Sequence, residues 1–293
     1  MGYLALFLLV TADDAGDTLA KKMLPLYIKE AEAYLLTVES APKKPFELKK
    51  EPVFEWSNPA RGGGQEGVVF VWLREGRPAA LASIFSTPAA ARFPRGRRVV
   101  HEFHALDPET LVVTRDAFNE WKPEAGLART EIADAGGPAG APGTRLVQMR
   151  QLAKEFTGHA LDKEGKRWEL RLLPAPLYRY PAAATGVVDG ALFALVSNAG
   201  TDPEVLLVIE ARKDASRVRW EFACGRFSDM ELHVFRKDKE VFTSVPGSAN
   251  PFTHDPKHTY RIYAEKVLTP EGKLLARIRQ MPNGPVVIPV EGK

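Results

Sequence analysis

The chain has 293 residues, of which 45% are apolar and 26% are charged, and this composition predicts a globular protein with one large domain or two ordinary ones. The 40 basic and 37 acidic residues nearly cancel, which argues against nucleic acid or an anionic membrane surface as the partner. The single cysteine, Cys224, excludes an internal disulfide and a metal site built from several cysteines.

The first twelve residues have the pattern of a short export signal. Leu4–Val10 is an apolar run, and Val10-Thr11-Ala12 is similar to the small-residue site at which signal peptides are cleaved. No lysine or arginine precedes the run, and seven apolar residues are too few to span a bilayer. We therefore expect residues 1–12 to be a signal peptide of an exported protein, periplasmic or extracellular. A buried N-terminal segment of a cytoplasmic protein is the alternative.

Residues 13–134 are expected to form a helix followed by curved antiparallel strands. The acidic segment Asp13–Asp17 is expected to be loose, and apolar residues at helical spacing predict an amphipathic helix over Leu24–Val38, with Pro25 in its first turn. From Phe46 the apolar period becomes two, which is typical of strands. A helix before curved strands is similar to cone-shaped folds of the nuclear-transport-factor type, as an analogy of fold alone. The expected strands of this half are Val53–Trp56, Val68–Leu73, Ala79–Phe85, Val99–Leu106 and Leu111–Thr114.

A low-complexity segment of Gly, Pro and Ala, residues 135–143, is the best candidate for a linker between two halves of the chain. After it, Thr144 is placed to cap a helix that continues to Phe156, with Gly158 as its stop. The remainder of 144–293 is expected to be antiparallel strands at short spacing, as in a sandwich or an open barrel. These strands are Trp168–Leu172, Ala191–Val196, Val205–Ile209, Val218–Cys224, Met230–Phe235, Glu240–Thr243, Tyr260–Leu268 and Lys273–Met281, with Val286–Val290 at an edge or outside the sheet because of Pro289.

Two apolar runs predict the centre of the fold. Ala191–Val196 and Val205–Ile209 are short, rich in branched residues and joined by the polar reversal Ser197–Pro203, so we expect a hairpin that is covered on both faces. Trp168–Leu172 alternates apolar and charged residues and predicts a half-buried strand beside the hairpin. The predicted fold class is α+β, predominantly antiparallel β as a sandwich or open barrel-like sheets, with two or more amphipathic helices.

Seven residues are candidates for a binding site: His101, Glu102, His104, Tyr178, Arg179, Tyr180 and Asp202. The two histidines are three residues apart, whereas a zinc-binding helix needs a separation of four. On a strand, this odd separation sends His101 and His104 to opposite faces and leaves Glu102 and His104 on the same face. A glutamate–histidine pair such as Glu102 and His104 can transfer a proton. The alternative interpretation is that His101 is a half-buried structural histidine and that Glu102 and His104 are a surface pair without a function.

The remaining candidates are weaker. Tyr178 and Tyr180 share one face of a strand and Arg179 the other, so the three side chains do not converge. Asp202 lies in the loop between the two buried strands, where sites are often held on a rigid scaffold, although Asp-Pro is also ordinary turn chemistry. The glycine-rich loop Arg61–Gly67 lacks the Gly-Lys-Ser/Thr ending of a phosphate-binding loop. Because no nucleophile elbow, supported Cys/His pair or dinucleotide fingerprint is present, we predict no catalytic residue, no metal and no cofactor.

A set of short motifs lies between about Phe46 and Leu232. They are Trp56-Ser-Asn-Pro59, Gly67-Val-Val-Phe-Val-Trp72, Gly76-Arg-Pro78, His101-Glu-Phe103, Arg145-Leu-Val-Gln-Met-Arg150, Leu170-Arg-Leu-Leu-Pro174, Leu177-Tyr-Arg-Tyr180, Gly190-Ala-Leu-Phe193 and Gly200-Thr-Asp-Pro203. With these motifs the chain resembles a group of uncharacterised exported proteins of planctomycete-type bacteria. The resemblance implies export and one structural unit across residues 135–143, and it supplies neither an activity nor a catalytic residue.

Functions of different classes remain open. The missing catalytic constellation favours an exported, soluble, non-catalytic binding or interaction protein, with a small ligand or an envelope partner. The first alternative is a hydrolase-like or lyase-like enzyme whose pocket is built from distant residues such as Glu102, His104 and Tyr178; the second is a structural envelope component. Titratable groups that converge in a concave pocket would favour the enzyme, and a shallow aromatic or apolar patch would favour the binding protein.

Overall fold

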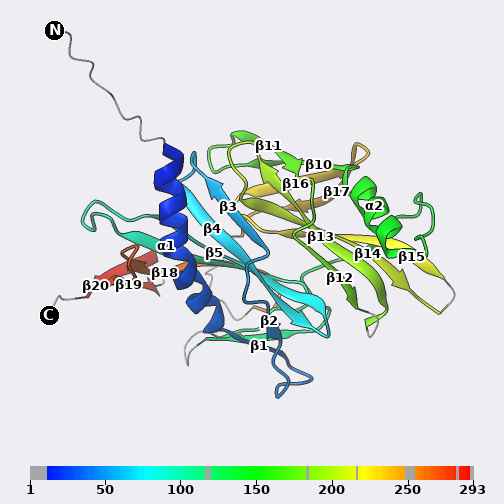
Figure 1. The fold of residues 1–293 in the computed structure, drawn as a ribbon, viewed down its shortest axis with the longest axis horizontal. Coiled ribbons are helices and arrows are strands. Elements are labelled where there is room, and N and C mark those ends of the chain that lie inside the picture. The colour runs from blue at the N-terminus through cyan, green and yellow to red at the C-terminus, as the bar shows by residue number, and fades with distance from the viewer. Residues whose placement is uncertain are drawn as a thin grey trace, which may run out of the picture.

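Figure 1 shows the computed structural model, which describes residues 12–115, 120–182, 185–215, 217–247, 255–281 and 284–290. Within these ranges the chain forms two helices and two large antiparallel sheets, stacked in the order helix, sheet, sheet, helix. The predicted class, mostly antiparallel β with a few helices, is confirmed. Neither of the two described helices has the length and apolar character needed to cross a membrane.

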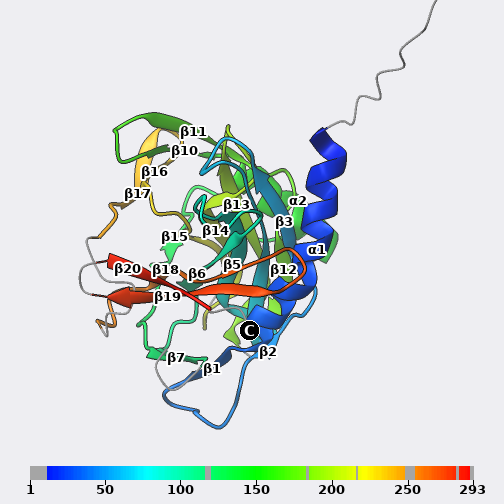
Figure 2. The ribbon, with the colours of Figure 1, turned by 90° about the vertical axis from the view of Figure 1, so that its left-hand side faces the viewer.

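The first large sheet contains strands from both ends of the chain. Its strand order is β2-β4-β5-β6-β18-β19-β20, and β3 pairs with β4. The strands are β2 (Glu47–Leu48), β3 (Phe54–Asn58), β4 (Gln65–Arg74), β5 (Arg77–Pro88), β6 (Arg97–Ala105), β18 (Tyr260–Leu268), β19 (Leu274–Met281) and β20 (Gly284–Pro289). Helix α1 (Ala12–Glu32) covers the outer face of this sheet, where Tyr27, Phe70 and Trp72 belong to one buried apolar cluster (Figures 1 and 2).

The second large sheet has the order β17-β16-β10-β11-β13-β14-β15-β9, and β12 pairs with β13. The strands are β9 (Thr130–Glu131), β10 (Phe156–Leu161), β11 (Arg167–Leu172), β12 (Tyr178–Ala182), β13 (Val187–Ser197), β14 (Pro203–Lys213), β15 (Val218–Arg226), β16 (Glu231–Arg236) and β17 (Lys239–Ser244). Helix α2 (Pro142–Ala153) covers the outer face, where Met149 packs in one cluster with Phe193 and Trp220. A small third sheet joins β1 (Leu35–Val38), β7 (Leu111–Thr114) and β8 (Glu120–Trp121).

The inner faces of the two large sheets pack on each other and form the middle of the molecule. Side chains of β13 alternate between its two sides: Leu192 and Ala194 lie in the cluster between the sheets, whereas Phe193 lies in the cluster under α2. This alternation confirms the predicted hairpin that is covered on both faces, with Leu192 opposite Val208 in the antiparallel register. The predicted half-buried strand is β11, which pairs with β13 and exposes alternate side chains.

The tight packing of the hairpin predicts a measurable cost for a single methylene. Ile209 is fully buried on β14, so Ile209→Val should lower the free energy of unfolding by about 0.5–1.5 kcal/mol. The matched control is Ile288→Val on the edge strand β20, where the side chain is 41% exposed and the same change should stay within about 0.5 kcal/mol. Urea unfolding of both variants measures the difference; equal costs would mean that the hairpin does not form a close-packed core.

The two predicted helices have different bounds in the structure. The first begins at Ala12, so its backbone includes the acidic segment expected to be loose, and Pro25 lies inside it. It ends at Glu32 rather than Val38, because Leu35–Val38 is the strand β1 and pairs with β7. The apolar residues at helical spacing up to Val38 thus belong to two elements, the helix α1 and the strand β1. Residues 1–11 of the expected signal peptide lie outside the described residues.

The second helix begins and ends earlier than expected. It runs from Pro142 to Ala153, and its cap position is Ala141, with no side-chain hydrogen bond from Thr144. Phe156 and Gly158, expected as helix end and stop, both lie in β10 and face β16. A Cβ at Gly158 would come within 2.7 Å of the His233 carbonyl oxygen, so this glycine permits the close approach of two strands.

The strand pairings do not follow the expected halves 13–134 and 144–293. Strand β9 precedes residues 135–143 and pairs with β15 of the second sheet. Strand β18 follows them and pairs with β6 of the first sheet. Residues 135–143 themselves lie against α2, where Arg145 donates hydrogen bonds to the carbonyl oxygens of Ala139 and Gly140. The segment therefore does not separate the two sheets.

Candidate functional site

Two loops meet at one end of the space between the sheets. The loop after β3 turns sharply because the Asn58 side-chain oxygen accepts hydrogen bonds from the backbone N–H groups of Ala60 and Arg61. The loop between β13 and β14 docks on it: the N–H of Thr201 donates to the Ser57 carbonyl oxygen at 2.9 Å. Loops that are 144 residues apart in the chain are thereby fixed side by side.

This docking directs Arg61 into a group of carboxylates. Its Nη1 lies 3.3 Å from an oxygen of Asp202 and 3.2 Å from one of Glu204, and its Nη2 lies 2.7 Å from Asp229. Asn58 holds the second Asp202 oxygen at 2.9 Å. Glu204 is fully buried, whereas the Asp229 side chain is 46% exposed. The group therefore extends from the interior to solvent.

A cavity of about 140 Å³ adjoins these groups between the two sheets. Charged and aromatic side chains line it together: Arg61, Arg98, Glu102, Asp202, Asp229, Trp56, Phe85 and Phe227. A second cavity of about 540 Å³ shares Asp229 and Ile262 with the first. Glu102 reaches the smaller cavity from β6 and accepts a hydrogen bond of 2.6 Å from the Tyr260 hydroxyl on β18.

Burial controls the protonation of two of these carboxyls. It raises the pKa of Glu204 to about 7, against the attraction of Arg61 and with added repulsion from Asp202. Burial also raises the pKa of Glu102 well above its usual value; the Tyr260 hydrogen bond opposes the shift, and the charge of Asp229 adds to it. Near neutral pH these two carboxyls therefore retain protons, Glu204 in about half of the molecules.

The structure brings two of the seven predicted residues together. Glu102 and Asp202 line the same cavity. His104 lines the larger neighbouring cavity, where its Nε2 is 3.2 Å from the Gly126 carbonyl oxygen and burial lowers its pKa to about 4. The prediction that His101 and His104 face opposite sides is confirmed, because His101 lies on the side of α1 and contacts Tyr34.

His101 belongs to a separate buried cluster. Its Nδ1 is 2.8 Å from the Tyr34 hydroxyl, and its Nε2 is 3.6 Å from Glu30 and 3.7 Å from Glu265. These three ligand atoms lie close enough to hold a metal ion. However, Arg115 bonds to both carboxylates and Lys266 lies 2.6 Å from Glu30. Two cations therefore already balance the two carboxylates, and the cluster fits a structural core better than a cation site.

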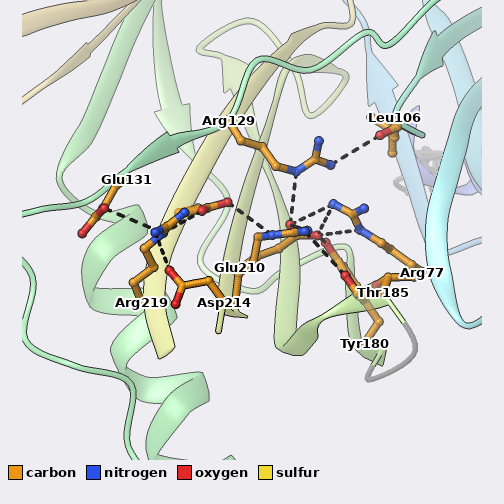
Figure 3. A network of polar contacts seen from close by, with 11 residues as sticks. Arg77, Leu106, Arg129, Glu131, Tyr180, Thr185, Glu210, Asp214 and Arg219 are labelled. Carbon is orange, nitrogen blue, oxygen red and sulfur yellow. Dashed lines mark hydrogen bonds and ion pairs between the residues drawn. The ribbon is translucent and has the colours of Figure 1, made fainter. Parts of the chain in front are cut away.

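The three residues of β12 do not converge, as predicted. The Tyr178 and Tyr180 rings stack with centroids 6.1 Å apart, while Arg179 binds Asp189 through Nε at 3.1 Å and Nη2 at 2.7 Å. The Tyr180 hydroxyl donates to Glu210 at 2.8 Å, within the network shown in Figure 3. None of the three lines the cavity beside Arg61.

Three residues of the site were not predicted from the sequence: Arg61, Glu204 and Asp229. One signal was present, since Glu204 is a charge at the start of the apolar run of β14 and has to be paired if buried. Arg61 and Asp229 lie in loops and have no local pattern that marks them. Comparisons with protein-family models, with curated proteins and with solved structures found no match to this chain.

Proposed function

We propose that the protein binds a small molecule with a protonated amine in the cavity between the sheets. The grouping of acidic side chains carries this proposal: three carboxyl groups contact Arg61, a fourth, Glu102, lines the same cavity, and Arg98 is the second guanidinium in its lining. Within the described residues, Arg61 is the one basic side chain that forms an ion pair with any of the four, which are Glu102, Asp202, Glu204 and Asp229. A cation beside Glu102 and Glu204 would favour the ionised forms of these buried carboxyls and pair with them, so the site can accept an added positive charge.

An ammonium group fits the shape and the donors of the site. It carries one positive charge and three hydrogen-bond donors, which match carboxyl oxygens on more than one side of the cavity. The rings of Trp56, Phe85 and Phe227 supply apolar walls for a short stem and faces for a cation. The partly exposed Asp229 lies where the site meets solvent. The adjoining cavity of about 540 Å³, which Asp229 also lines, has room for the rest of a larger ligand.

Calorimetric titration with 1,4-diaminobutane tests the proposal. The diamine should bind with a Kd below about 1 mM, and neutral 1,4-butanediol should not bind measurably. Asp229→Asn removes one carboxylate at the partly exposed rim and should weaken binding about tenfold. The matched control is Asp238→Asn in the exposed β16–β17 turn, which should leave the Kd unchanged. Equal binding of diamine and diol, or equal effects of the two variants, would contradict amine binding.

An acid–base enzyme is the second candidate, because the convergence of titratable groups in a concave pocket is the feature expected of one. Glu204, with its pKa of about 7, and Glu102, with its raised pKa, lie beside the carboxyl groups of Asp202 and Asp229. A carboxyl with a raised pKa can serve as the general acid of a hydrolase or lyase. A turnover whose pH profile has a limb near 7 that Glu204→Gln abolishes would support it; ligands recovered unchanged after binding would count against it.

Export to the periplasm or the exterior stays part of the proposal on the basis of residues 1–12 alone. Mass spectrometry of protein isolated from its source should find an N-terminus near residue 13, and an intact Met1 would contradict export.

A further inference from the structure

A third cavity, of about 370 Å³ and lined mostly by charged side chains, lies where β5 of the first sheet meets β14 and β15 of the second. One buried carboxylate, Glu210 on β14, holds it together (Figure 3). Arg77 from β5 binds Glu210 through Nε and Nη2, each at 2.9 Å, and the Tyr180 hydroxyl donates at 2.8 Å. This bidentate bond links the two sheets and fixes the orientation of the Arg77 guanidinium.

Two further arginines share the same carboxylate at longer range. Arg129 Nε and Arg212 Nη1 each lie 3.3 Å from the second Glu210 oxygen. The remaining contact of Arg129 is one hydrogen bond of 3.5 Å to the Leu106 carbonyl oxygen. Within the described part of the chain, Nη1 of Arg129 and Nη1 of Arg77 donate to no protein acceptor. Donors are therefore left over beside the cavity.

The cavity carries an excess of positive charge. Five basic side chains line it: Arg77, Arg129, Arg212, Lys213 and Arg219. Asp214 and Glu221 also line it, and Glu210 lies beneath them, which makes three acidic side chains; a fourth, Glu131, is 3.7 Å from Arg219 but is balanced by Arg217 outside the cavity, at 2.8 Å. Burial and the like charge of Arg77 both lower the pKa of Arg129, and the charge of Glu210 opposes this shift. A bound anion would relieve this repulsion.

We propose that this cavity binds a dianionic phosphate group. The charge excess matches a phosphate dianion, and planar guanidinium groups with fixed donors are the side chains best suited to phosphate oxygens. The volume of about 370 Å³ lies within the range of small-molecule sites, so the phosphate can be free or part of a small monoester. The site is built from residues other than those of the amine cavity and does not depend on the function proposed for that cavity.

Calorimetric titration of the full chain at low ionic strength tests this site with inorganic phosphate, glycerol 3-phosphate and acetate. Both phosphates should bind with a Kd below about 1 mM, and acetate at least about tenfold more weakly. A preference for the monoester would identify a phosphorylated molecule as the ligand, and a preference for inorganic phosphate the free ion. Binding of neither phosphate, or of acetate as well as phosphate, would overturn the proposal.

Arg129→Gln is the informative variant because the contacts of Arg129 to the protein are long, so the fold should survive its loss. Phosphate affinity should fall about tenfold. The matched control is Arg217→Gln, at an exposed arginine that pairs with Glu131 and does not line the cavity; its affinity should equal that of the unmodified protein. Thermal melting of both variants checks folding. An equal loss in both, or no loss in Arg129→Gln, would show that phosphate does not bind at this cavity.

Discussion

Replacing Arg61 by methionine should lower the free energy of unfolding by about 3–5 kcal/mol, because it removes the one basic partner of a buried group of carboxylates. Arg61 bonds to Asp202, Glu204 and Asp229, and only the last of these is well exposed. The methionine side chain is similar in length to the methylene stem of Arg61. The lower free energy of unfolding therefore measures the loss of the positive charge rather than a loss of packing. Urea unfolding at pH 7 measures it.

Two further variants make this result specific. Arg171→Met removes an exposed arginine whose side chain donates to the Gly200 carbonyl oxygen in the same loop region, and it should cost no more than about 0.5 kcal/mol. Asp202→Asn in the Arg61→Met background removes one of the carboxylates left without a partner and should recover part of the stability. If Arg61→Met costs no more than Arg171→Met, the carboxylates do not depend on Arg61.

The second large effect is the contribution of Glu204 to stability, which is lost as the pH rises. In the unfolded chain Glu204 has a pKa near 4.5, and in the folded protein its pKa is about 7. Between these values the folded state retains a proton that the unfolded state has released, so the free energy of unfolding falls with increasing pH. At 1.36 kcal/mol per pH unit, the contribution lost between pH 4.5 and 7 is about 3 kcal/mol.

The difference between the unmodified protein and Glu204→Gln isolates this contribution. Glutamine stays neutral at every pH, so Glu204→Gln lacks this loss. Between pH 4.5 and 7 its free energy of unfolding should therefore fall by about 3 kcal/mol less than that of the unmodified protein. His104 acts in the opposite direction: its pKa of about 4 means that stability is lost as the pH falls below its unfolded value of about 6.5. That term is common to both proteins and cancels. Parallel stability curves for the two would contradict the raised pKa of Glu204.

Local patterns predicted the elements of the fold better than their connections. The apolar runs 191–196 and 205–209 identified the central hairpin, because burial on both faces leaves a continuous apolar sequence. Strand alternation correctly placed His101 and His104 on opposite faces. The predicted end of the first helix, Val38, was wrong because Leu35–Val38 continues the apolar spacing of the helix, although its residues pair with β7. Only this pairing with a strand far along the chain distinguishes a strand from a continued helix at Leu35–Val38.

Two residues of the site, Glu102 and Asp202, were among the predicted candidates, but their arrangement around Arg61 could not be predicted, for the same reason. Arg61 and Asp202 are separated by 141 residues, and Arg77 and Glu210 by 133. Neither pair forms a spacing motif, because each contact depends on how the two sheets stack. Arg61 appeared in the sequence only as the first residue of a glycine-rich loop without phosphate-binding features. The docking of that loop on the β13–β14 loop is what directs the guanidinium inward.

The charge of the cavity between the sheets is tested most directly by counting protons during amine binding. Titration of 1,4-diaminobutane at pH 7, repeated in two buffers of different ionisation enthalpy, gives the number of protons exchanged for each ligand bound. Glu204 is about half protonated at this pH, and a bound cation favours its ionised form. We expect Glu204 to release about half a proton per diamine, so Glu204→Gln should release about half a proton less than the unmodified protein; protonated Glu102, which lines the cavity, contributes to the release in both proteins. Binding with no proton exchange, or with proton uptake, would contradict a cation held among these carboxylates.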